Sequence, residues 1–385
     1  MRIGIDIRCL VEGRHTGVEE YTINLLHHLF AIDKKNRYVL FLNSFRKPNF
    51  DFSEFAEYKN VSVKKFNYPN KLLNFLFWYF DWPKIDRLIG GTDVMFFPNI
   101  IFSAWSKKSK AVFTIHDLSF ERYPETFSAK RRLWHVFINP KKICGKADRI
   151  ISVSDSTKND LQEIYEIPEG KIKTIYNGVS GKFSPIDRNN SKLVIVKEKY
   201  KLPYKFVLYL GTIEPRKNII GVIRAYNQLR KLNHPELERH KLVIAGASGW
   251  KQKQIFEEIG KSPFQSDIIF AGFIDDKDKP AVYNLASLFV YPSFFEGFGF
   301  PPLEAMSCGI PVIASNNSSF PETVGSAGVM TDPDKPDEIY RAMKEILLDK
   351  KLQEQFREKG IAQVRKFDWR KTAQEFLKII QSLNK

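Results

Sequence analysis

The chain has 385 residues, 43% of them hydrophobic and 27% charged, an ordinary balance for a globular protein with room for two domains. Its three cysteines are few and widely separated, which excludes a disulfide framework or a cysteine-rich zinc site and favours a reducing cytoplasm. Because 60 Lys and Arg stand against 44 Asp and Glu, the net charge is +16, which raises the question of an anionic partner.

The N-terminal segment predicts a strand at Ile3–Ile7. Charged residues stand where a signal peptide would need an apolar stretch, so the segment does not have the pattern of a signal peptide. The most apolar run, Leu72–Phe80, has about half the length that crosses a bilayer, so no transmembrane span is expected. Both observations favour the cytoplasm, with peripheral contact with the inner face of a membrane left open.

Short apolar strands alternate with helical stretches along the whole chain, which predicts an α/β protein with parallel sheets. A polar, proline-containing stretch, Lys182–Lys192, reads as a linker. We therefore expect two doubly wound domains, residues 1–185 and 186–369, and a last helix within residues 370–385. Strands are predicted at Ile3–Ile7, Val39–Leu42, Val61–Phe66, Val94–Pro98, Val112–His116, Ile150–Val153, Lys173–Tyr176, Phe206–Leu210, Leu242–Ala245, Ile268–Ala271, Leu288–Tyr291, Pro311–Ala314 and Gly328–Met330.

The positive charge is concentrated in residues 59–149, which hold 17 Lys and Arg and 7 Asp and Glu. This window also contains the aromatic run Leu72–Trp82 and the basic runs Lys107–Lys110 and Lys130–Arg132. Aromatic and basic residues together suit an anionic membrane surface or an anionic lipid-linked substrate. A buried helix beside a solvated basic face, or binding to nucleic acid, would also give this composition.

Two loops at strand ends are candidate sites in the first domain. The loop Glu12–Gly17 follows the first strand, and Thr16 with Glu19 forms a capping-box pattern for a helix over Val18–Phe30. Glycine there would allow a phosphate or sugar to approach the backbone closely. The strand Val112–His116 ends in a histidine followed by Asp117, which places an imidazole at the sheet rim.

The glycine pattern that binds dinucleotides is not present in the sequence, so hydride transfer with NAD is not expected.

A third candidate follows the strand Phe206–Leu210, where Arg216 and Lys217 precede Asn218. We expect these cations to open the next helix, Ile219–Leu232. Cations in a first helical turn oppose the helix dipole unless an anion lies between them and the backbone amides. The pattern therefore predicts a bound diphosphate, which Arg grips with two hydrogen bonds and Lys attracts as a point charge.

The fourth candidate is a pair of carboxylates, Glu296 and Glu304, separated by a Gly-Phe-Gly-Phe-Pro-Pro turn. A helix is expected to start at the prolines and to stop at Gly309. Glu304 would stand in its first turn and accept ribose hydroxyls, while Glu296 would reach a sugar from the turn itself. Such pairs also occur in glycoside hydrolases, but the cations of the third candidate favour transfer over hydrolysis.

Two Asp-X-Asp triplets, Asp276–Asp278 and Asp332–Asp334, could be offered as metal sites. Both lie in turn sequence and read more simply as helix caps, so no metal is expected.

Taken together, these motifs resemble the retaining glycosyltransferase family 4. The resemblance rests on the glycine-containing loop before the first helix, Thr114–Asp117, Gly211–Asn218, Phe270–Phe273 and the segment from Glu296 to Glu304 that continues to Pro321-Glu322. It implies the GT-B architecture, in which two Rossmann-like domains face each other across a deep cleft, and a last helix that crosses back to the first domain. The family needs no metal and no cofactor beyond its co-substrate, a nucleotide diphosphate sugar.

The resemblance also implies where the donor nucleotide binds. Arg216 and Lys217 would hold the diphosphate, with Gly17 approaching it from the first domain. Glu304 would bind the ribose, and the dipeptide Phe273-Ile274 would lie near the base.

The transferred sugar has its own implied contacts. Glu296 and the backbone amides around Phe298, Gly299 and Phe300 would bind it, and His116 would contact it at the reacting face. Glu296, His116 and the two cations are thus the residues implied in catalysis.

Within the family, Thr114–Phe127 and Phe294–Pro302 are most similar to bacterial mannosyltransferases of O-antigen and other surface polysaccharides. This suggests GDP-mannose as donor and a saccharide or polyprenyl-linked glycan as acceptor, compatible with Leu72–Pro83 on the acceptor side. The alternatives are a UDP-sugar-dependent member of the family, a phosphorylase or epimerase of the same architecture, a basic nucleic-acid-binding protein without a recognised motif, and a non-catalytic membrane-associated scaffold.

Overall fold

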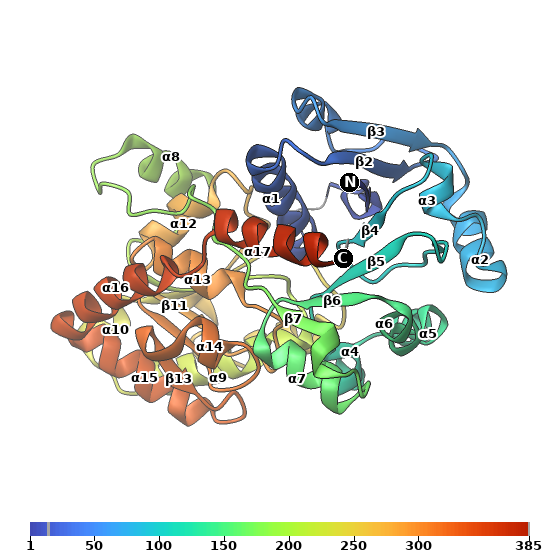
Figure 1. Ribbon diagram of the computed structural model, residues 1–385. Helices are drawn as coiled ribbons and strands as arrows, with labels where there is room; N and C mark the ends of the chain where they lie inside the picture. The colour runs from blue at the N-terminus through green and yellow to red at the C-terminus, as the bar shows by residue number, and fades with distance from the viewer. Residues whose placement is uncertain (14–15, 384–385) are drawn as a thin grey trace. The chain divides into compact units, whose positions relative to one another are not determined.

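The structure is a computed structural model and describes residues 1–13 and 16–383. The chain folds as two compact units (Figure 1). The first contains Met1–Arg122, Ala129–Gly178 and the C-terminal segment from Asp368, and the second contains Tyr123–Ser128 and Val179–Phe367. The short segment Tyr123–Ser128 therefore belongs to the second unit, although its sequence neighbours on both sides belong to the first.

The first unit is built on a parallel sheet with the strand order β3-β2-β1-β4-β5-β6-β7. Its strands are β1 (Arg2–Asp6), β2 (Arg37–Asn43), β3 (Val61–Phe66), β4 (Val94–Phe97), β5 (Lys110–Ile115), β6 (Arg149–Ser152) and β7 (Ile172–Thr174). Its helices are α1 (Gly17–Ile32), α2 (Asn70–Phe80), α3 (Ile85–Leu88), α4 (Ser119–Arg122), α5 (Ala129–Ile138), α6 (Pro140–Lys146), α7 (Asp155–Glu163) and α17 (Trp369–Ser382).

The second unit repeats this plan with the strand order β10-β9-β8-β11-β12-β13. Its strands are β8 (Phe206–Leu210), β9 (Lys241–Ala245), β10 (Ile268–Gly272), β11 (Leu288–Tyr291), β12 (Val312–Ser315) and β13 (Val329–Thr331). Its helices are α8 (Ser191–Lys199), α9 (Ile219–Arg230), α10 (Pro235–Glu238), α11 (Lys253–Gly260), α12 (Lys279–Leu285), α13 (Phe300–Ser307), α14 (Phe320–Thr323), α15 (Pro336–Leu348) and α16 (Lys350–Val364).

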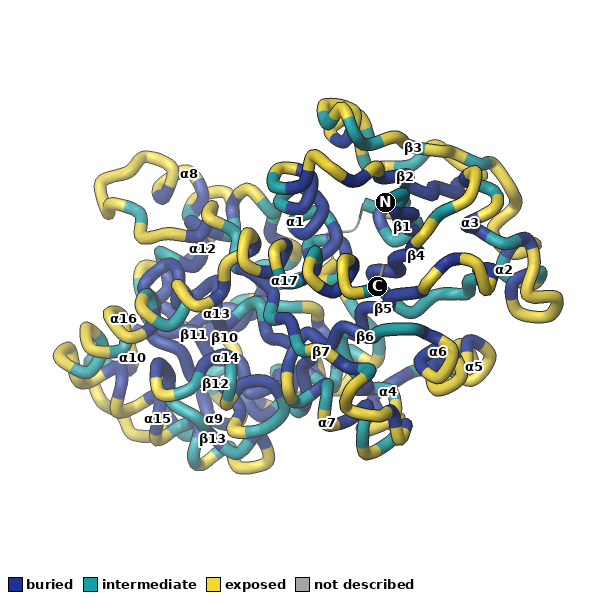
Figure 2. Tube along the Cα trace, viewed as in Figure 1, coloured by how far each residue is buried: buried dark blue, intermediate teal, exposed yellow. Residues whose placement is uncertain are grey.

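The predicted α/β class and each predicted strand are confirmed, with strand bounds shifted by at most two residues. The strands are apolar because helices cover both faces of a parallel sheet, so side chains on both faces are buried. Every residue of β4 is buried, for example (Figure 2), and so is every residue of β8. The core of each unit therefore follows its central strands.

The predicted helix after the first strand is also confirmed. α1 begins at Gly17, and Thr16 and Glu19 form the expected capping box: the Thr16 amide donates to Glu19 Oε2 at 2.8 Å, and the Glu19 amide donates to Thr16 Oγ1 at 3.3 Å. These two bonds satisfy backbone donors that a helix start otherwise leaves without partners. Residues 14 and 15 of the preceding loop lie outside the described residues.

The last helix, α17, packs against α1 in the first unit. The ring of Phe376 lies 4.5 Å from that of Phe96 on β4, and Thr372 Oγ1 donates to the Tyr176 carbonyl at 2.7 Å. α17 thus buries its apolar side on the sheet of the first unit.

Most of the aromatic run Leu72–Trp82 lies in α2, which ends at Phe80, and the interpretation of this run as a buried helix is wrong. Only Leu73 and Phe77 of α2 are buried, while Tyr79 and Phe80 are among its exposed rings. Leu73 and Phe77 are four residues apart, so a single face of the helix turns inward. Within residues 1–13 and 16–383, no helix combines the length and the apolar character needed to cross a bilayer.

A close approach between two backbone segments shapes the second unit after β9. Gly246 has a φ of +143°, and a Cβ atom on it would lie 1.8 Å from the carbonyl oxygen of Gly211. Gly211 begins the loop that carries the two predicted phosphate-binding cations. Only glycine allows the two loops to come this close.

We expect Gly246→Ala to lower the free energy of unfolding by about 1–3 kcal/mol, because the added methyl group must push the Gly211 loop away. Urea denaturation measures the change. Gly260→Ala at the end of α11 is the control, since a Cβ there meets no atom within 4 Å. Equal stability of the two variants would contradict the prediction.

Candidate functional site

The predicted phosphate and sugar loops lie on either side of the point where the second sheet reverses its winding. The chain runs from β8 outward to β9 and β10 and then returns to place β11 on the other side of β8. The loops after β8 and β11 therefore diverge at one edge of the sheet. In doubly wound sheets, ligands bind at this position, outside the carboxyl ends of the strands.

Four charged side chains from these two loops form one cluster: Glu214, Arg216, Lys217 and Glu296. Lys217 Nζ donates a hydrogen bond to Glu296 Oε1, and Arg216 Nη1 lies 3.3 Å from Glu296 Oε2. Arg216 Nη2 donates to Glu214 Oε1 at 2.9 Å. The structure thus brings together Arg216, Lys217 and Glu296, which the sequence had predicted as site residues. It adds Glu214 to the cluster, a residue of the motif Gly211–Asn218 for which the sequence predicted no role.

The four side chains of this charged cluster are shielded from solvent. Glu214 is 3% exposed, and Lys217 and Glu296 are each 8% exposed. Burial alone raises the pKa of the Glu296 carboxyl, but the charges of Lys217 and Arg216 outweigh burial and lower the pKa to about 2. Burial and the charge of Arg216 lower the pKa of Lys217, against the opposing effect of Glu296. Glu296 is therefore ionised at neutral pH.

Two tyrosines form an apolar floor beside the charged cluster. The rings of Tyr209 and Tyr291 are stacked with centroids 5.6 Å apart, and Lys217 Nζ lies 5.4 Å from the Tyr291 centroid. Burial, reinforced by nearby carboxylates, raises the pKa of both phenols far above their usual range, so they stay neutral. A neutral, buried surround strengthens the charge interactions in the cluster.

The expectation that Arg216 and Lys217 open a helix is wrong. Both lie in a separate 3-10 turn, Pro215–Lys217, and α9 begins only at Ile219. Asn218, with a left-handed φ of +53°, separates the 3-10 turn from α9. The helix dipole therefore does not call for an anion here, and in this structure the anions facing the cations are Glu214 and Glu296.

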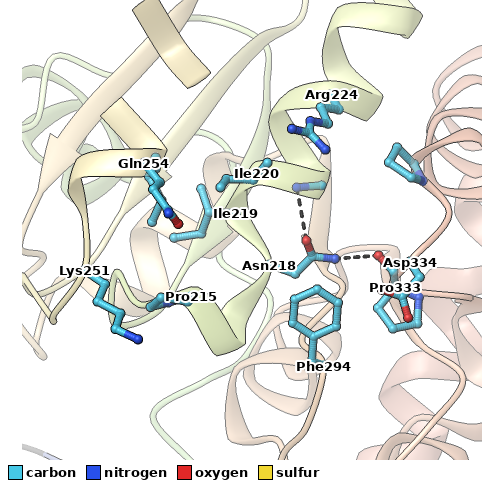
Figure 3. A pocket seen from close by; sticks show the side chains of 13 residues that line it. Pro215, Asn218, Ile219, Ile220, Arg224, Lys251, Gln254, Phe294, Pro333 and Asp334 are labelled. Atoms are coloured by element: carbon cyan, nitrogen blue, oxygen red, sulfur yellow. Dashed lines mark hydrogen bonds between the residues drawn. The ribbon is translucent and has the colours of Figure 1, made fainter. Parts of the chain in front are cut away.

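Asn218 fixes the loop that carries the cations. Its Oδ1 accepts a hydrogen bond from the Gly221 amide at 3.1 Å, and its Nδ2 donates to the Pro333 carbonyl at 2.6 Å (Figure 3). A pocket of about 370 Å³ lies beside this contact, lined in part by Arg224 and Phe294. None of the residues predicted to bind the donor or to act in catalysis lines this pocket, although Asn218 does.

Small polar side chains that the sequence reasoning missed hold the loop after β11. Ser293 Oγ donates to the Arg216 carbonyl at 3.1 Å, and Ser315 Oγ donates to the Ser293 carbonyl. Ser318 Oγ accepts from the Glu296 amide and donates to the Glu296 carbonyl, each at 2.9 Å. The available signal was the presence of serines near the ends of two buried strands: Ser293 two residues after β11, Ser315 as the last residue of β12, and Ser318 three residues beyond it.

Glu304 has a different neighbour from Glu296. It is the fifth residue of α13, so the prediction that it stands in the first turn is wrong. It is buried and accepts a hydrogen bond from Tyr283 Oη at 2.7 Å. Burial and the Glu304 charge raise the pKa of Tyr283 well above its usual range, so Tyr283 remains a hydrogen-bond donor.

The start of α13 matches its prediction, with prolines in the first turn and Gly309 after the end. Gly299 precedes the helix with a φ of +88°, where a Cβ would come within 2.8 Å of the Phe320 ring. Phe298 is buried, and its ring lies 5.1 Å from that of Phe300. The glycine thus permits the sharp turn that leads from Glu296 into the helix.

The dipeptide predicted to lie near the base follows β10. Phe273 is 53% exposed and follows Gly272, which has a φ of +70°, whereas Ile274 is buried. Only the Phe273 ring has a large surface available for stacking.

In the first unit, His116 follows β5 and binds the residue after β4. Its Nε2 lies 2.8 Å from the Pro98 carbonyl oxygen, and its ring meets Tyr21 edge-on at 4.9 Å. A carbonyl only accepts, so Nε2 carries the proton. Burial lowers the pKa of the imidazole, which favours the neutral form with its lone pair on Nδ1. Gly17, the other predicted residue of this unit, is the first residue of α1.

The two Asp-X-Asp triplets match the expectation of helix caps only in part: Asp278 is the N-cap residue of α12, but its side chain makes no capping hydrogen bond, and the N-cap residue of α15 is Lys335. Asp276 pairs with Lys182 and Lys279, and Asp278 pairs with Lys199. Asp332 accepts the Asp334 amide in a turn before α15. Within the described ranges, no group of three or more His, Cys, Asp or Glu side chains is arranged to hold a metal ion.

Comparison with known families agrees with these motifs. Residues 15–181 match the family model described as Glycosyltransferase Family 4, and residues 192–363 match the model described as Glycosyl transferases group 1. The chain therefore belongs to the glycosyltransferases of family 4, and its two doubly wound units are those of the GT-B architecture.

Two relatives in Escherichia coli are mannosyltransferases. The chain is 35% identical over 261 residues to the O-antigen chain mannosyltransferase B, covering 68% of this chain and 67% of that protein. It is 35% identical over 282 residues to the serotype-specific mannosyltransferase WbdA, covering 71% of this chain. That match spans 34% of WbdA, about a third of its length.

The fold is also that of solved structures. The structure of Anabaena Alr3699/HepE in complex with UDP-glucose matches with a TM-score of 0.72 and 18% identity, covering 99% of this chain and 100% of that one. Identity at this level supports the fold alone.

The low pKa of Glu296 predicts a specific pH dependence of stability. A carboxyl whose pKa is lowered on folding stabilises the protein above its unfolded pKa, and this stabilisation is lost as the pH falls toward the folded pKa. With a folded pKa of about 2 and an ordinary unfolded value, the stability difference between the wild type and Glu296→Gln should shrink by about 2 kcal/mol from pH 7 to pH 3. Urea denaturation at both pH values measures it.

Glu358→Gln serves as the control because Glu358 is exposed on α16. Its stability difference from the wild type should be the same at both pH values. A pH-independent difference for Glu296→Gln would show that Glu296 titrates normally.

Proposed function

We propose that the protein is a retaining mannosyltransferase, which moves mannose from GDP-mannose to a saccharide or lipid-linked saccharide in surface polysaccharide synthesis. The observation that carries the proposal is the buried contact of Arg216 and Lys217 with Glu296 at the switch point of the second sheet. The 35% identity to mannosyltransferase relatives supports the choice of sugar.

The cations suit the diphosphate of the donor. Arg216 offers a planar guanidinium for two phosphate oxygens, and Lys217 a compact charge beside it. The backbone that carries them is fixed, because the Lys217 amide donates to the Glu214 carbonyl and the Ser293 hydroxyl donates to the Arg216 carbonyl. Because they are shielded from water, their attraction for an anion is stronger than at a surface.

The carboxylates suit hydroxyl groups. Glu296 is ionised at neutral pH and accepts hydrogen bonds only, so it fits the hydroxyls of the transferred sugar. Glu304 would take the vicinal hydroxyls of the ribose in place of its bond to Tyr283. His116 belongs to the other unit, and its contact with the sugar stays a prediction from the family resemblance.

In the proposed reaction, the bond between C1 of mannose and the β-phosphate oxygen breaks and GDP leaves. The acceptor hydroxyl oxygen bonds to C1 on the same face, and its proton passes to the leaving phosphate oxygen. Negative charge develops on the diphosphate, so Arg216 and Lys217 stabilise the transition state more than the ground state. No metal ion is invoked for this step.

A UDP-sugar is the second candidate donor. The HepE structure, which has a similar fold, holds UDP-glucose, but a similar fold does not choose the donor, and the mannosyltransferase relatives favour GDP-mannose.

We expect GDP and GDP-mannose to raise the midpoint of thermal unfolding, since a ligand at 100 times its Kd stabilises by about 2.7 kcal/mol. A thermal-shift panel of GDP, UDP, ADP and dTDP, each with and without its sugar, measures this. A response to UDP but not to GDP would contradict the choice of donor.

Lys217→Ala should lower the rate of mannose transfer by about 100-fold or more, because it removes a cation that faces the developing charge. Transfer from radiolabelled GDP-mannose, with the anomeric configuration of the product read by NMR, measures the effect. Glu296→Gln should act in the same direction.

Lys231→Ala is the matched control, because Lys231 is an exposed lysine just beyond α9. Full transfer activity in a folded Lys217→Ala variant would overturn the assignment. Release of sugar phosphate with inorganic phosphate and no acceptor would indicate a phosphorylase.

A further inference from the structure

An exposed apolar patch lies on two neighbouring helices of the first unit. It consists of Phe75, Trp78, Tyr79 and Phe80 of α2 with Val136 and Phe137 of α5, and each of these side chains is between 43% and 71% exposed. We call these six residues the aromatic patch. Exposed apolar side chains are ordinary when scattered, but a contiguous group of them marks a surface for interaction.

The rings of the aromatic patch touch one another. Phe75 is stacked on Tyr79 with centroids 5.8 Å apart, and Tyr79 meets Phe80 at 4.8 Å. Trp78 meets Phe137 edge-on at 5.2 Å, which joins α2 to α5. The patch is therefore one surface rather than two separate ones.

The aromatic patch stays exposed because each of the two helices buries only a few of its side chains. Leu73 and Phe77 are the buried residues of α2, and Ile138 is the buried residue of α5. Each helix thus contributes only a narrow stripe of side chains to the core of the first unit. Burying the remaining rings would need a partner that this unit does not supply.

The chain around the patch carries positive charge. Residues 129–146, which form α5 and α6, contain six Lys and Arg and no Asp or Glu. Lys130, Arg132 and Lys142 are all exposed. Apolar rings flanked by cations on a short amphipathic helix are the features of a segment that lies in the interface of an anionic bilayer.

We propose that the aromatic patch docks the protein on the surface of an anionic lipid bilayer. The rings of α2 and α5 enter the boundary between headgroups and acyl chains, and the basic side chains of residues 129–146 face the lipid phosphates. The helices lie on the membrane and do not span it, because α2 covers only Asn70–Phe80.

Other occupants fit these observations less well. Nucleic acid would use the cations and stack on rings, but it gives no reason to expose Val136 among them. A second copy of the chain would bring the same positive charge to both sides of the contact. An anionic bilayer offers apolar chains for the rings and the aliphatic side chain, and phosphates for the cations.

The test is sedimentation of the full chain with vesicles of phosphatidylglycerol or of phosphatidylcholine, at low and high salt. One variant removes rings and an aliphatic side chain, Tyr79→Ser with Phe80→Ser and Val136→Ser. The other reverses charge, Lys130→Glu with Arg132→Glu and Lys142→Glu.

Each variant has a control on exposed side chains of the second unit. The apolar control replaces Val194, Ile195 and Tyr204 by Ser, and the charge control replaces Lys344, Lys350 and Lys351 by Glu. Thermal unfolding establishes that all four variants are folded.

We expect the wild type to bind phosphatidylglycerol vesicles in preference to phosphatidylcholine, and less at high salt. Both patch variants should lower the partition coefficient about tenfold or more, while the controls stay within about twofold of the wild type. The vesicles carry no sugar acceptor and the assay has no donor, so its result is independent of the proposed transfer reaction.

Three outcomes would overturn the proposal. One is the absence of binding to phosphatidylglycerol, and another is equal binding by patch and control variants. The third is a patch-dependent change in sedimentation velocity or in the mobility of a nucleic acid without vesicle binding, which would assign the patch to a second copy or to nucleic acid.

Discussion

The buried ion pair between Lys217 and Glu296 is the contact on which the second unit's functional edge depends. It joins residues 79 positions apart in the chain, from the loops that follow β8 and β11. Breaking such a pair by removing one partner costs about 3–5 kcal/mol, because the other charge stays buried. The two loops are therefore held together whenever this unit is folded, and Ser293 and Ser318 fix the backbone around the pair.

The same pair bears on ligand binding. The charged cluster contains two cations, Arg216 and Lys217, and two carboxylates, Glu214 and Glu296, so it is neutral before any anion enters. On the proposed function, a diphosphate competes with Glu296 for the two cations. Glu296, once it has lost part of its contact with these cations, would then accept hydrogen bonds from the sugar hydroxyls. A neutral resting cluster thus avoids the cost of two unpaired buried cations, and on the proposed function it would couple phosphate binding to sugar binding.

The first unit uses its aromatic residues in two ways. Phe96 and Phe376 pack in the core, where β4 and α17 meet. The rings of the aromatic patch instead remain outside, since α2 and α5 each present only a narrow stripe to the sheet. Composition alone does not separate these uses, because the same residue types serve both. The exposed rings and the neighbouring cations give the first unit a surface that its fold does not require.

The sequence by itself determined the fold class, the strands and three of the four residues of the charged cluster, Arg216, Lys217 and Glu296. Strands are apolar on both faces in parallel sheets, and side chains at their carboxyl ends meet at one edge, so local pattern carries this information. It did not determine where helices begin after irregular turns: Asn218 at φ +53° separates Arg216 and Lys217 from α9, and α13 begins at Phe300, so Glu304 lies beyond its first turn. Only the tertiary structure paired the cations with Glu214 and Glu296 and left the rings of α2 exposed. Which charges pair and which side chains are buried depends on the segments that come together in the fold. The spacing of residues along the chain does not contain this information.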